Sequence, residues 1–289
     1  MCSKITLYVL YAKQTNRLAH DGEYRRALKD FNSYATTLYP HLMAIDETIP
    51  ELPLKDTVYR IYRDTRFSKD PTPYKPYFSA AWSRTGRKGP YAVYYLHCEP
   101  DTHAQRSASA KLTSKAKSRP ANSRTSNKTT ANSSIASEWS TSCGNGSSLI
   151  AGGLWSPDKD ALALIRASID NNPLAWHDVL SDPLIVATFL ASNDPKAVHD
   201  SDRAIAAFAT HSSYNALKTK PRDYAANHEM IQLLKLRSFV LTRRVADEVF
   251  TSESGQETIA GLFKALEKFV SCFPRLYVDR KRGVGLAAC

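Results

Sequence analysis

The residues best suited to chemistry lie in one short segment, residues 59–75, which reads YRIYRDTRFSKDPTPYK. Seven of its seventeen residues are charged, and two prolines near its end exclude a continuing strand or helix. The chain must therefore turn here, and the turn can gather Arg63, Arg66 and Lys75. Arginine presents a planar fork of donors that fits carboxylate or phosphate groups. The segment therefore predicts a pocket for a small anion.

Two carboxylates and a tyrosine lie in the same segment. Asp64 follows Arg63, Asp70 precedes the first proline, and Tyr74 is adjacent to Lys75. In one interpretation Asp64 or Asp70 orients an arginine or acts as an acid or base on a ligand that Tyr74 also contacts. In the other, arginine–aspartate pairs hold the loop against the sheet without catalysis, because a structural network engages the same residue types. Both interpretations stay open.

Two other segments are weaker candidates for ligand binding. Gly152 and Gly153 come late in an expected strand, where they allow either close approach of a ligand or tight packing beneath a helix. The packing interpretation is the more usual one. Lys218 belongs to a basic loop with one proline, residues 215–222, which is either a solvated connector or a second wall of the anion site.

The sequence lacks the motifs of the well-known catalytic and cofactor-binding classes. It contains no phosphate-binding Gly-rich loop, no His-Glu-x-x-His and no Gly-x-Ser-x-Gly. We therefore predict neither a metal nor a cofactor. His97 is the one histidine on a convincing strand, and we expect it to be a half-buried, hydrogen-bonded residue rather than a ligand-binding one.

Cysteine usage and hydropathy indicate an intracellular protein, either cytoplasmic or nuclear. The five cysteines are far apart and form no Cys-x-x-Cys pair, so we expect thiols in a reducing compartment. No stretch approaches the roughly 20 apolar residues that a membrane span requires. We therefore expect no membrane partner, and the sequence makes no prediction of the oligomeric state.

The formal net charge of +11 invites a nucleic-acid interpretation, but the charge is unevenly distributed. Residues 101–147 hold seven basic and two acidic residues, a net +5, within a Ser/Thr/Lys/Asn-rich tract. A tract with so few apolar residues cannot offset its ordering entropy, so residues 102–147 are predicted to be a disordered insertion. A nucleic-acid partner is therefore possible but not favoured.

The elements that must position these residues can be predicted from periodicity. Apolar residues at spacings of three and four predict a helix over residues 22–45, and alternation predicts strands. The expected strands cover residues 58–63, 76–83, 91–98, 148–155 and 238–243. The later helices are expected to begin at Ser156-Pro157 and to cover residues 174–180, 202–211, 227–236 and 257–272. This order predicts an α+β fold, an antiparallel sheet packed with helices and a mostly helical C-terminal half, in a single domain over residues 1–289.

The run from Arg60 to Lys75 closely resembles the signature of a bacterial and fungal family, domain of unknown function 2461. Further matching segments are Tyr94-Tyr95, Gly152 to Pro157, Leu217-Lys218 with Pro221, and Leu233 to Phe239. The resemblance covers about residues 23–270 and implies an α+β domain without an established activity. The positions of its motif in this chain are Arg63, Asp64, Arg66, Phe67, Asp70, Tyr74 and Lys75. The chain departs from the family pattern at Asn16-Arg17, where a Trp-Phe pair is missing, in the insertion, and in the tail from Pro274.

Three hypotheses of function follow. The first is a domain that binds a small anionic ligand (phosphate, nucleotide or carboxylate) through Arg63, Arg66 and Lys75, and that either holds this ligand or acts on it as an enzyme. The second is a nucleic-acid-associated module that uses the basic insertion and the Tyr-rich sheet as a stacking surface. The third is an accessory role in a fungal metabolic pathway, since the amino-acid sequences of several segments resemble those of fungal family members.

Overall fold

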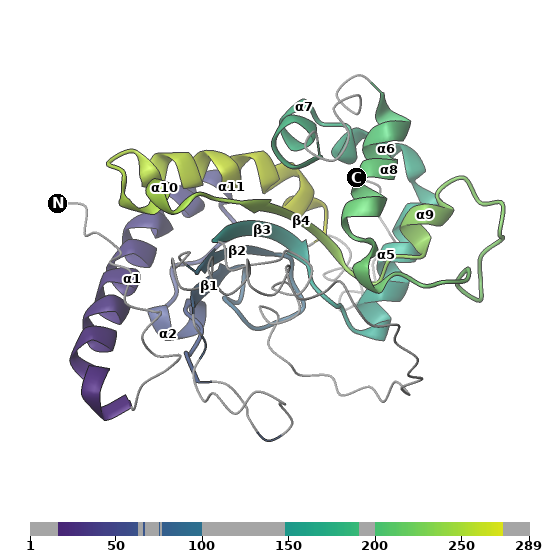
Figure 1. Ribbon diagram of the computed structural model, residues 1–289. Coiled ribbons are helices and arrows are strands. Elements are labelled where there is room, and N and C mark those ends of the chain that lie inside the picture. Colours follow the sequence, from purple (N-terminus) through teal and green to yellow (C-terminus); the bar gives the residue numbers. More distant parts are fainter. Residues whose placement is uncertain are drawn as a thin grey trace, which may run out of the picture.

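The computed structural model describes residues 17–62, 66, 75, 77–99, 148–190 and 200–273. At its centre is a four-stranded antiparallel sheet in the order β1-β2-β3-β4 (Figure 1). The strands are β1 (Phe78–Trp82), β2 (Val93–Cys98), β3 (Leu149–Leu154) and β4 (Phe239–Arg244). Together with the helices, which dominate the C-terminal half, this sheet confirms the predicted α+β class.

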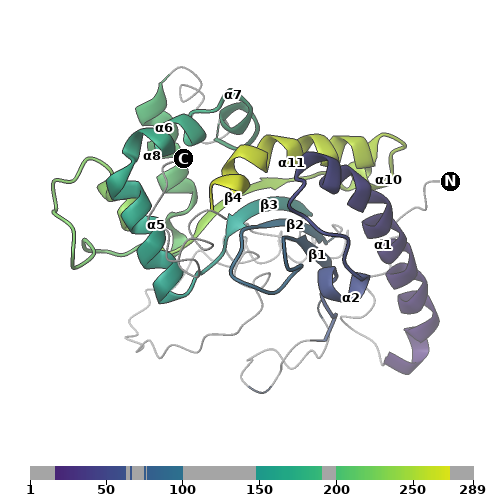
Figure 2. The same ribbon diagram turned by 180° about the vertical axis from the view of Figure 1, so that it is seen from behind.

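The helices fall into two groups around the sheet. They are α1 (Arg17–Ile45), α2 (Leu54–Thr57), α5 (Lys159–Asn171), α6 (Pro173–Leu180), α7 (Pro183–Ile185), the π-helix η2 (Val186–Leu190), α8 (Ser201–His211), the 3-10 helix η4 (Ser213–Asn215), α9 (Ile231–Leu234), α10 (Asp247–Thr251) and α11 (Gly255–Cys272). Figures 1 and 2 show α11 lying across one face of the sheet, with α1 beside it at the β1 side. Helices α5, α6, α8 and α9 gather at the opposite end (Figure 1).

Three predicted elements are corrected by the structure. The expected strand over residues 58–63 is not a continuous strand where it is described, up to residue 62. Instead Val58 forms an isolated bridge with Ala80, and the Tyr59 amide donates to the Ser79 carbonyl at 2.9 Å. The helix expected from Ser156-Pro157 begins at Lys159, because the Asp158 side chain caps it by accepting from the Ala161 amide at 2.7 Å. The helix expected over residues 227–236 is a single turn, α9.

The main core lies between the sheet and helices α1 and α11. On this face the alternate strand residues are mostly apolar, with the exposed Arg243 of β4 as an exception, and the helices present residues at spacings of three and four. The largest fully buried side chains here are Phe31, Leu38 and Leu42 of α1, Phe263 and Phe269 of α11, and Phe78, Trp82, Tyr94, Leu96 and Phe239 of the sheet. This packing determines the position of the sheet relative to α1 and α11. The opposite face of the sheet carries a separate set of side chains.

The second face of the sheet, defined as the face away from α11, carries a smaller apolar cluster. Its buried members are Ala81, Tyr95, Leu149, Ala151 and Val240, with Tyr59, Val93 and Trp155 packed at their margins. Alternation along β2 places His97 on this face as well, since it is two residues from Tyr95. The face therefore mixes small apolar residues with polar aromatic ones.

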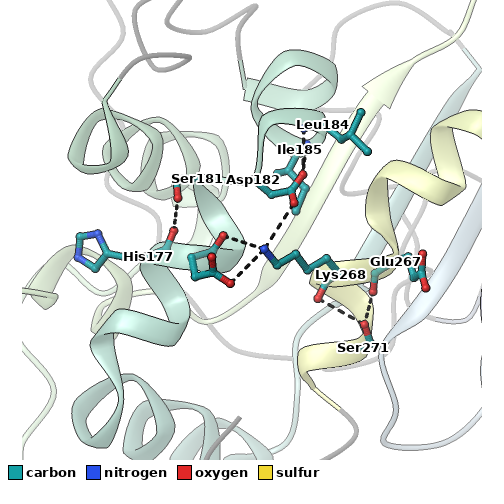
Figure 3. Close-up of polar contacts among 9 residues, drawn as sticks. His177, Ser181, Asp182, Leu184, Ile185, Glu267, Lys268 and Ser271 are labelled. Carbon is teal, nitrogen blue, oxygen red and sulfur yellow. Dashed lines mark hydrogen bonds and ion pairs between the residues drawn. The ribbon is translucent and has the colours of Figure 1, made fainter.

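A lysine near the end of α11 links this helix to the helical end of the molecule. Lys268 Nζ lies 3.0 Å from Asp178 Oδ2 in α6 and 3.5 Å from Asp182 Oδ2 (Figure 3). The Asp182 side chain also accepts from the Leu184 amide at 2.9 Å, which caps α7. The hydrogen bond with Asp178 raises the pKa of Lys268. One ammonium therefore ties α11, α6 and the start of α7 together.

Two further expectations concern the membrane and the thiols. Over the described part of the chain, no helix has the length and apolar character to cross a bilayer. Cys98 and Cys272, the two cysteines within it, carry thiols rather than disulfides, as expected. The predicted insertion, residues 102–147, lies outside the described residues.

Candidate functional site

A row of buried polar side chains runs along β2 on the second face of the sheet. The Tyr95 hydroxyl lies 3.3 Å from Nδ1 of His97, and Nε2 of His97 lies 3.0 Å from Oε2 of Glu99. His97 is only 4% exposed and Glu99 only 5%. Burying a polar group is costly unless it is hydrogen-bonded. The hydrogen bonds among these three side chains therefore compensate for their burial.

The local sequence explains why these three side chains meet. Residues 95, 97 and 99 are separated by two, so an extended backbone places them on the same side. Neighbouring strands complete the layer, since His97 is opposite Ser79 of β1 and Leu149 of β3. Just beyond the strand, the Glu99 amide donates to Ser148 Oγ at 3.1 Å, which anchors the end of the row.

The hydrogen-bond partners assign a direction to the row. A carboxylate oxygen accepts, so the proton between His97 and Glu99 lies on Nε2 of the imidazole. In the neutral imidazole with that proton, Nδ1 accepts from the Tyr95 hydroxyl. Burial raises the pKa of Tyr95 well above its ordinary value, so the phenol remains a donor at neutral pH. The hydrogen bond with Ser79 opposes this rise. Ser79, Tyr95, His97 and Glu99 therefore form one connected chain of proton donors and acceptors.

A buried cation lies next to this row. Lys75 is 8% exposed, and its Nζ lies 5.8 Å from the ring centre of Tyr59 and 5.7 Å from that of Tyr77. The Lys75 amide donates to the Ile61 carbonyl at 2.9 Å, which places the residue beside the segment that leads into the predicted site. The Tyr77 ring in turn packs on His97 with centroids 4.2 Å apart. The Tyr77 ring therefore lies close to both the Lys75 ammonium and the His97 imidazole.

The arrangement combines two chemical abilities. Aromatic faces stabilise a cation by up to about 2 kcal/mol when it is desolvated, so Tyr59 and Tyr77 help keep a charged Lys75 in a buried position. A histidine hydrogen-bonded at both nitrogens is a side chain of the type that takes up or releases protons in acid–base chemistry. The layer can thus attract an anion and exchange a proton with a neighbouring group.

Most of the predicted anion site falls outside the part of the chain that the structure describes. Arg63, Asp64, Asp70 and Tyr74 lie there, so their grouping stays a prediction. Arg66 is described and is exposed, whereas Lys75 is buried on the second face.

The two glycines lie beneath α11 rather than beside Lys75. A β-carbon on Gly152 would lie 2.9 Å from Leu266 Cδ1, and one on Gly153 would meet the Phe239 carbonyl oxygen. Gly153 also has a φ of +123°. Close packing therefore explains both glycines, and their role in ligand binding stays a prediction without support from this geometry.

Lys218 is exposed in the segment between η4 and α9, which Figure 1 shows on the far side of the sheet from β1. The structure therefore does not bring Lys218 together with Lys75. Its assignment to the same anion site stays a prediction.

The spacing of residues 95, 97 and 99 in the sequence could have predicted this row of side chains. Tyr59, Tyr77 and Glu99 were not among the predicted site residues, although Tyr95-x-His97-x-Glu99 is a strict period-two pattern within an expected strand. His97 was expected to be half-buried and hydrogen-bonded. It is hydrogen-bonded at both nitrogens and is more deeply buried than expected.

The structure also bears on stacking and on metals. Tyr77, Tyr94 and Tyr95 are all at least 95% buried, so these sheet tyrosines do not present a surface on which bases could stack. Within the described residues, no group of three or more histidine, cysteine or acidic side chains could hold a metal ion.

Comparisons with known proteins give one match. A family model described as "Conserved hypothetical protein (DUF2461)" matches residues 17–109 and 119–271. The match spans all four strands and the helices around them, and its gap falls within the predicted insertion. Neither the curated proteins nor the solved structures include a match to the chain.

Proposed function

This chain belongs to the family of conserved hypothetical proteins DUF2461, and we propose that it binds a small anionic ligand beside Lys75 on the second face of the sheet. The ligand class is a phosphate, a nucleotide or a carboxylate. The observation that carries the proposal is the buried Lys75 ammonium between the rings of Tyr59 and Tyr77, one ring away from the His97–Glu99 pair.

Charge and burial support an anion at this place. Inside the protein an ammonium and an anion attract each other more strongly than they do in water, so an anion that reaches Lys75 would be held effectively there. Lys75 ends the sequence segment that contains Arg63 and Arg66, and we propose that these two arginines also donate to the anion. Arginine and lysine together would neutralise the two charges of a phosphate.

The buried histidine adds a chemical step to this binding site. With Nε2 donating to Glu99, the Nδ1 side of His97 is the end of the row that can accept a proton through Tyr95. A ligand bound at Lys75 would thus lie near His97, whose imidazole can serve as a general acid or base. This supports acid–base chemistry on the bound anion, in addition to simple binding.

Isothermal titration calorimetry tests the proposal. The panel holds inorganic phosphate, nucleoside mono- and triphosphates, and mono- and dicarboxylates. At least one class is expected to bind, and Lys75→Met, which keeps the aliphatic stem and removes the charge, is expected to weaken it at least tenfold, or about 1.4 kcal/mol. Lys29→Met, at an exposed position on α1, is the matched control and should leave the affinity unchanged.

A second variant guards against a folding defect. Arg63→Ala should weaken the same ligand while circular dichroism and the melting temperature report an intact fold. The proposal fails if no member of the panel binds, or if Lys75→Met and Arg63→Ala both bind the ligand like the unmodified chain.

A further inference from the structure

The turn that joins β1 to β2 concentrates positive charge. Residues 83–89 read SRTGRKG and contain Arg84, Arg87 and Lys88 but no acidic residue. The absence of acids extends beyond the turn, because no aspartate or glutamate occurs anywhere in residues 71–98. Lys88 is exposed, and the two arginines are partly exposed. The turn therefore presents three cations to solvent within five residues.

Helix α2 holds this turn in place and adds a fourth cation. The Arg87 amide donates to the Asp56 carbonyl at 2.8 Å, and the Arg87 side chain donates through Nε and Nη2 to the Lys55 carbonyl at 3.2 and 3.0 Å. Gly86, with a φ of +74°, lies so close to α2 that a β-carbon there would clash with the Asp56 carbonyl oxygen. Lys55 is itself exposed. The basic turn cluster is defined as the four cations of this region, Lys55, Arg84, Arg87 and Lys88.

Aromatic rings restrain both arginines of the cluster. The Arg87 guanidinium lies 5.6 Å from the ring centre of Tyr59, whose hydroxyl donates to the Arg87 carbonyl at 3.4 Å. The Arg84 guanidinium lies 5.8 Å from the ring centre of Tyr91. An arginine side chain loses up to about 2 kcal/mol of rotamer entropy when it is fixed. Because the fold already restrains both side chains, an anion that binds them loses less free energy to their ordering.

The fold does not neutralise this charge. In the part of the chain that the structure describes, no carboxylate forms an ion pair with the basic turn cluster, although Asp56 directly follows Lys55. By contrast, Lys264 and Lys268 of α11 each have a carboxylate partner. Two of the five N–H groups of Arg87 donate to the Lys55 carbonyl, which leaves three for another acceptor. The cluster is therefore suited to an anion from outside the chain.

The chemistry of the cluster favours a phosphate backbone over a membrane or an acidic protein. A membrane-binding surface combines its cations with exposed apolar side chains. Among the described residues the exposed large apolar side chains lie outside α2 and the turn, at Tyr62, Leu174, Leu184 and Tyr214. Protein surfaces usually mix acids with cations, whereas duplex DNA has one negative charge per about 1.7 Å, so several phosphates lie within reach of four neighbouring cations. The net charge of +11 also attracts a polyanion from a distance.

We propose that the basic turn cluster binds the phosphate backbone of a nucleic-acid duplex without reading its sequence. Each cation contacts a phosphate oxygen and releases counterions condensed on the duplex, which supplies the free energy of binding. The bases take no part, because the sheet tyrosines Tyr77, Tyr94 and Tyr95 are buried and offer no stacking surface. This binding is separate from the small-anion site beside Lys75, since it uses different cations and a different ligand.

Fluorescence anisotropy with a labelled DNA duplex of about 20 base pairs, added to the full chain at several salt concentrations, tests the proposal. Lys55→Gln combined with Lys88→Gln removes two ammonium groups that make no hydrogen bond among the described residues. This double variant should weaken binding at least tenfold at about 0.1 M salt and reduce the slope of log K against log salt by about 2. Lys159→Gln combined with Arg222→Gln removes the same charge from exposed positions toward the end of the molecule where α5 and α9 lie (Figure 1), and should leave the slope unchanged.

The arginines provide a second measurement. Arg84→Gln and Arg87→Gln should each reduce the slope by about 1, with circular dichroism and the melting temperature reporting whether the variants are folded. Duplexes rich in A·T and in G·C should bind equally. The proposal is overturned if the duplex does not bind, or if the Lys55/Lys88 double variant binds it with the slope of the unmodified chain. Tenfold tighter binding of single-stranded DNA, of polyglutamate, or of phosphatidylcholine vesicles with phosphatidylserine than of the duplex would overturn the assignment to a duplex backbone.

Discussion

Nε2 of His97 lies 3.0 Å from Oε2 of Glu99, and both side chains are almost completely buried. The hydrogen bond between them therefore offsets much of the free energy that each side chain loses on removal from water. In a buried pair of this kind the loss of one partner costs more than the pair contributes, because the remaining group keeps its desolvation penalty.

This relationship predicts a difference between two substitutions of Glu99. Glu99→Gln keeps an oxygen that can accept from Nε2 and should lower the free energy of unfolding by about 1 kcal/mol. Glu99→Ala leaves His97 without this acceptor and should cost about 2–3 kcal/mol. Urea denaturation followed by circular dichroism measures both. If both variants lowered the free energy of unfolding by the same amount, the His97–Glu99 hydrogen bond would not be what stabilises this row of side chains.

The pH dependence of stability should depend on His211. Burial holds the pKa of His211 below its usual value, and its Nε2 accepts from the Thr242 amide at 3.0 Å. The unfolded chain therefore takes up a proton before the folded one does. The contribution of His211 is complete above about pH 6.5 and is lost as the pH falls from there through the lower pKa of the folded state.

Urea denaturation at pH 7.5 and pH 5.5 tests this dependence. His211→Gln, which keeps an acceptor near Nε2, should reduce the loss of stability between the two pH values. His41→Gln, at an exposed position on α1, should not. The same loss in all three proteins would remove His211 from the explanation.

Cys98 should be unreactive in the folded protein. Burial raises the pKa of its thiol to about 12, so almost no thiolate exists at neutral pH, and thiolate is the reactive form. Pulse labelling with iodoacetamide, followed by peptide mass spectrometry, should modify the partly buried Cys272 before Cys98. Labelling of Cys98 should begin only with global unfolding in urea. Modification of Cys98 as fast as Cys272 in the native state would contradict the burial.

The glycines of β3 should differ in their tolerance of alanine. Gly152→Ala presses on the flexible end of Leu266 and should cost about 1–3 kcal/mol. Gly153→Ala should cost more, because its φ of +123° is strained for alanine and the new β-carbon meets the backbone of Phe239. Gly261→Ala on α11 has open space around it and should stabilise the helix slightly. Melting temperatures give the order, and a greater loss for Gly152→Ala than for Gly153→Ala would refute it.

The contact of Lys268 with Asp178 and Asp182 should contribute only modestly. Lys268 is about half exposed, so water screens its pairs, and Lys268→Met should cost less than about 1 kcal/mol. The cost should shrink further in 1 M salt. A double-mutant cycle with Asp182→Asn measures the coupling directly. A coupling above about 2 kcal/mol would mean that α11 depends on this clasp far more than its exposure implies.

Local patterns in the sequence were sufficient for much of the fold. Alternation identified β1 to β4 to within two residues at each end, because the two faces of each strand differ in their surroundings. The apolar spacing of α11 was equally clear. Alternation failed over residues 58–62, where the described contacts with β1 are the Val58–Ala80 bridge and the hydrogen bond from the Tyr59 amide to Ser79. The pattern of side-chain types does not determine how many backbone hydrogen bonds a segment forms with a neighbouring strand.

What the sequence by itself determined is which residues carry chemistry and which of them share a face of their own strand, as Tyr95, His97 and Glu99 do. Only the tertiary structure decided which segments meet there. Lys75 approaches His97 through Tyr77, and Trp155 stacks on a tyrosine about sixty residues further along the chain. The physical reason is that such contacts arise from strand register and helix packing, which sum many weak interactions over the whole chain. The spacing of residues within one segment therefore does not predict contacts between distant segments.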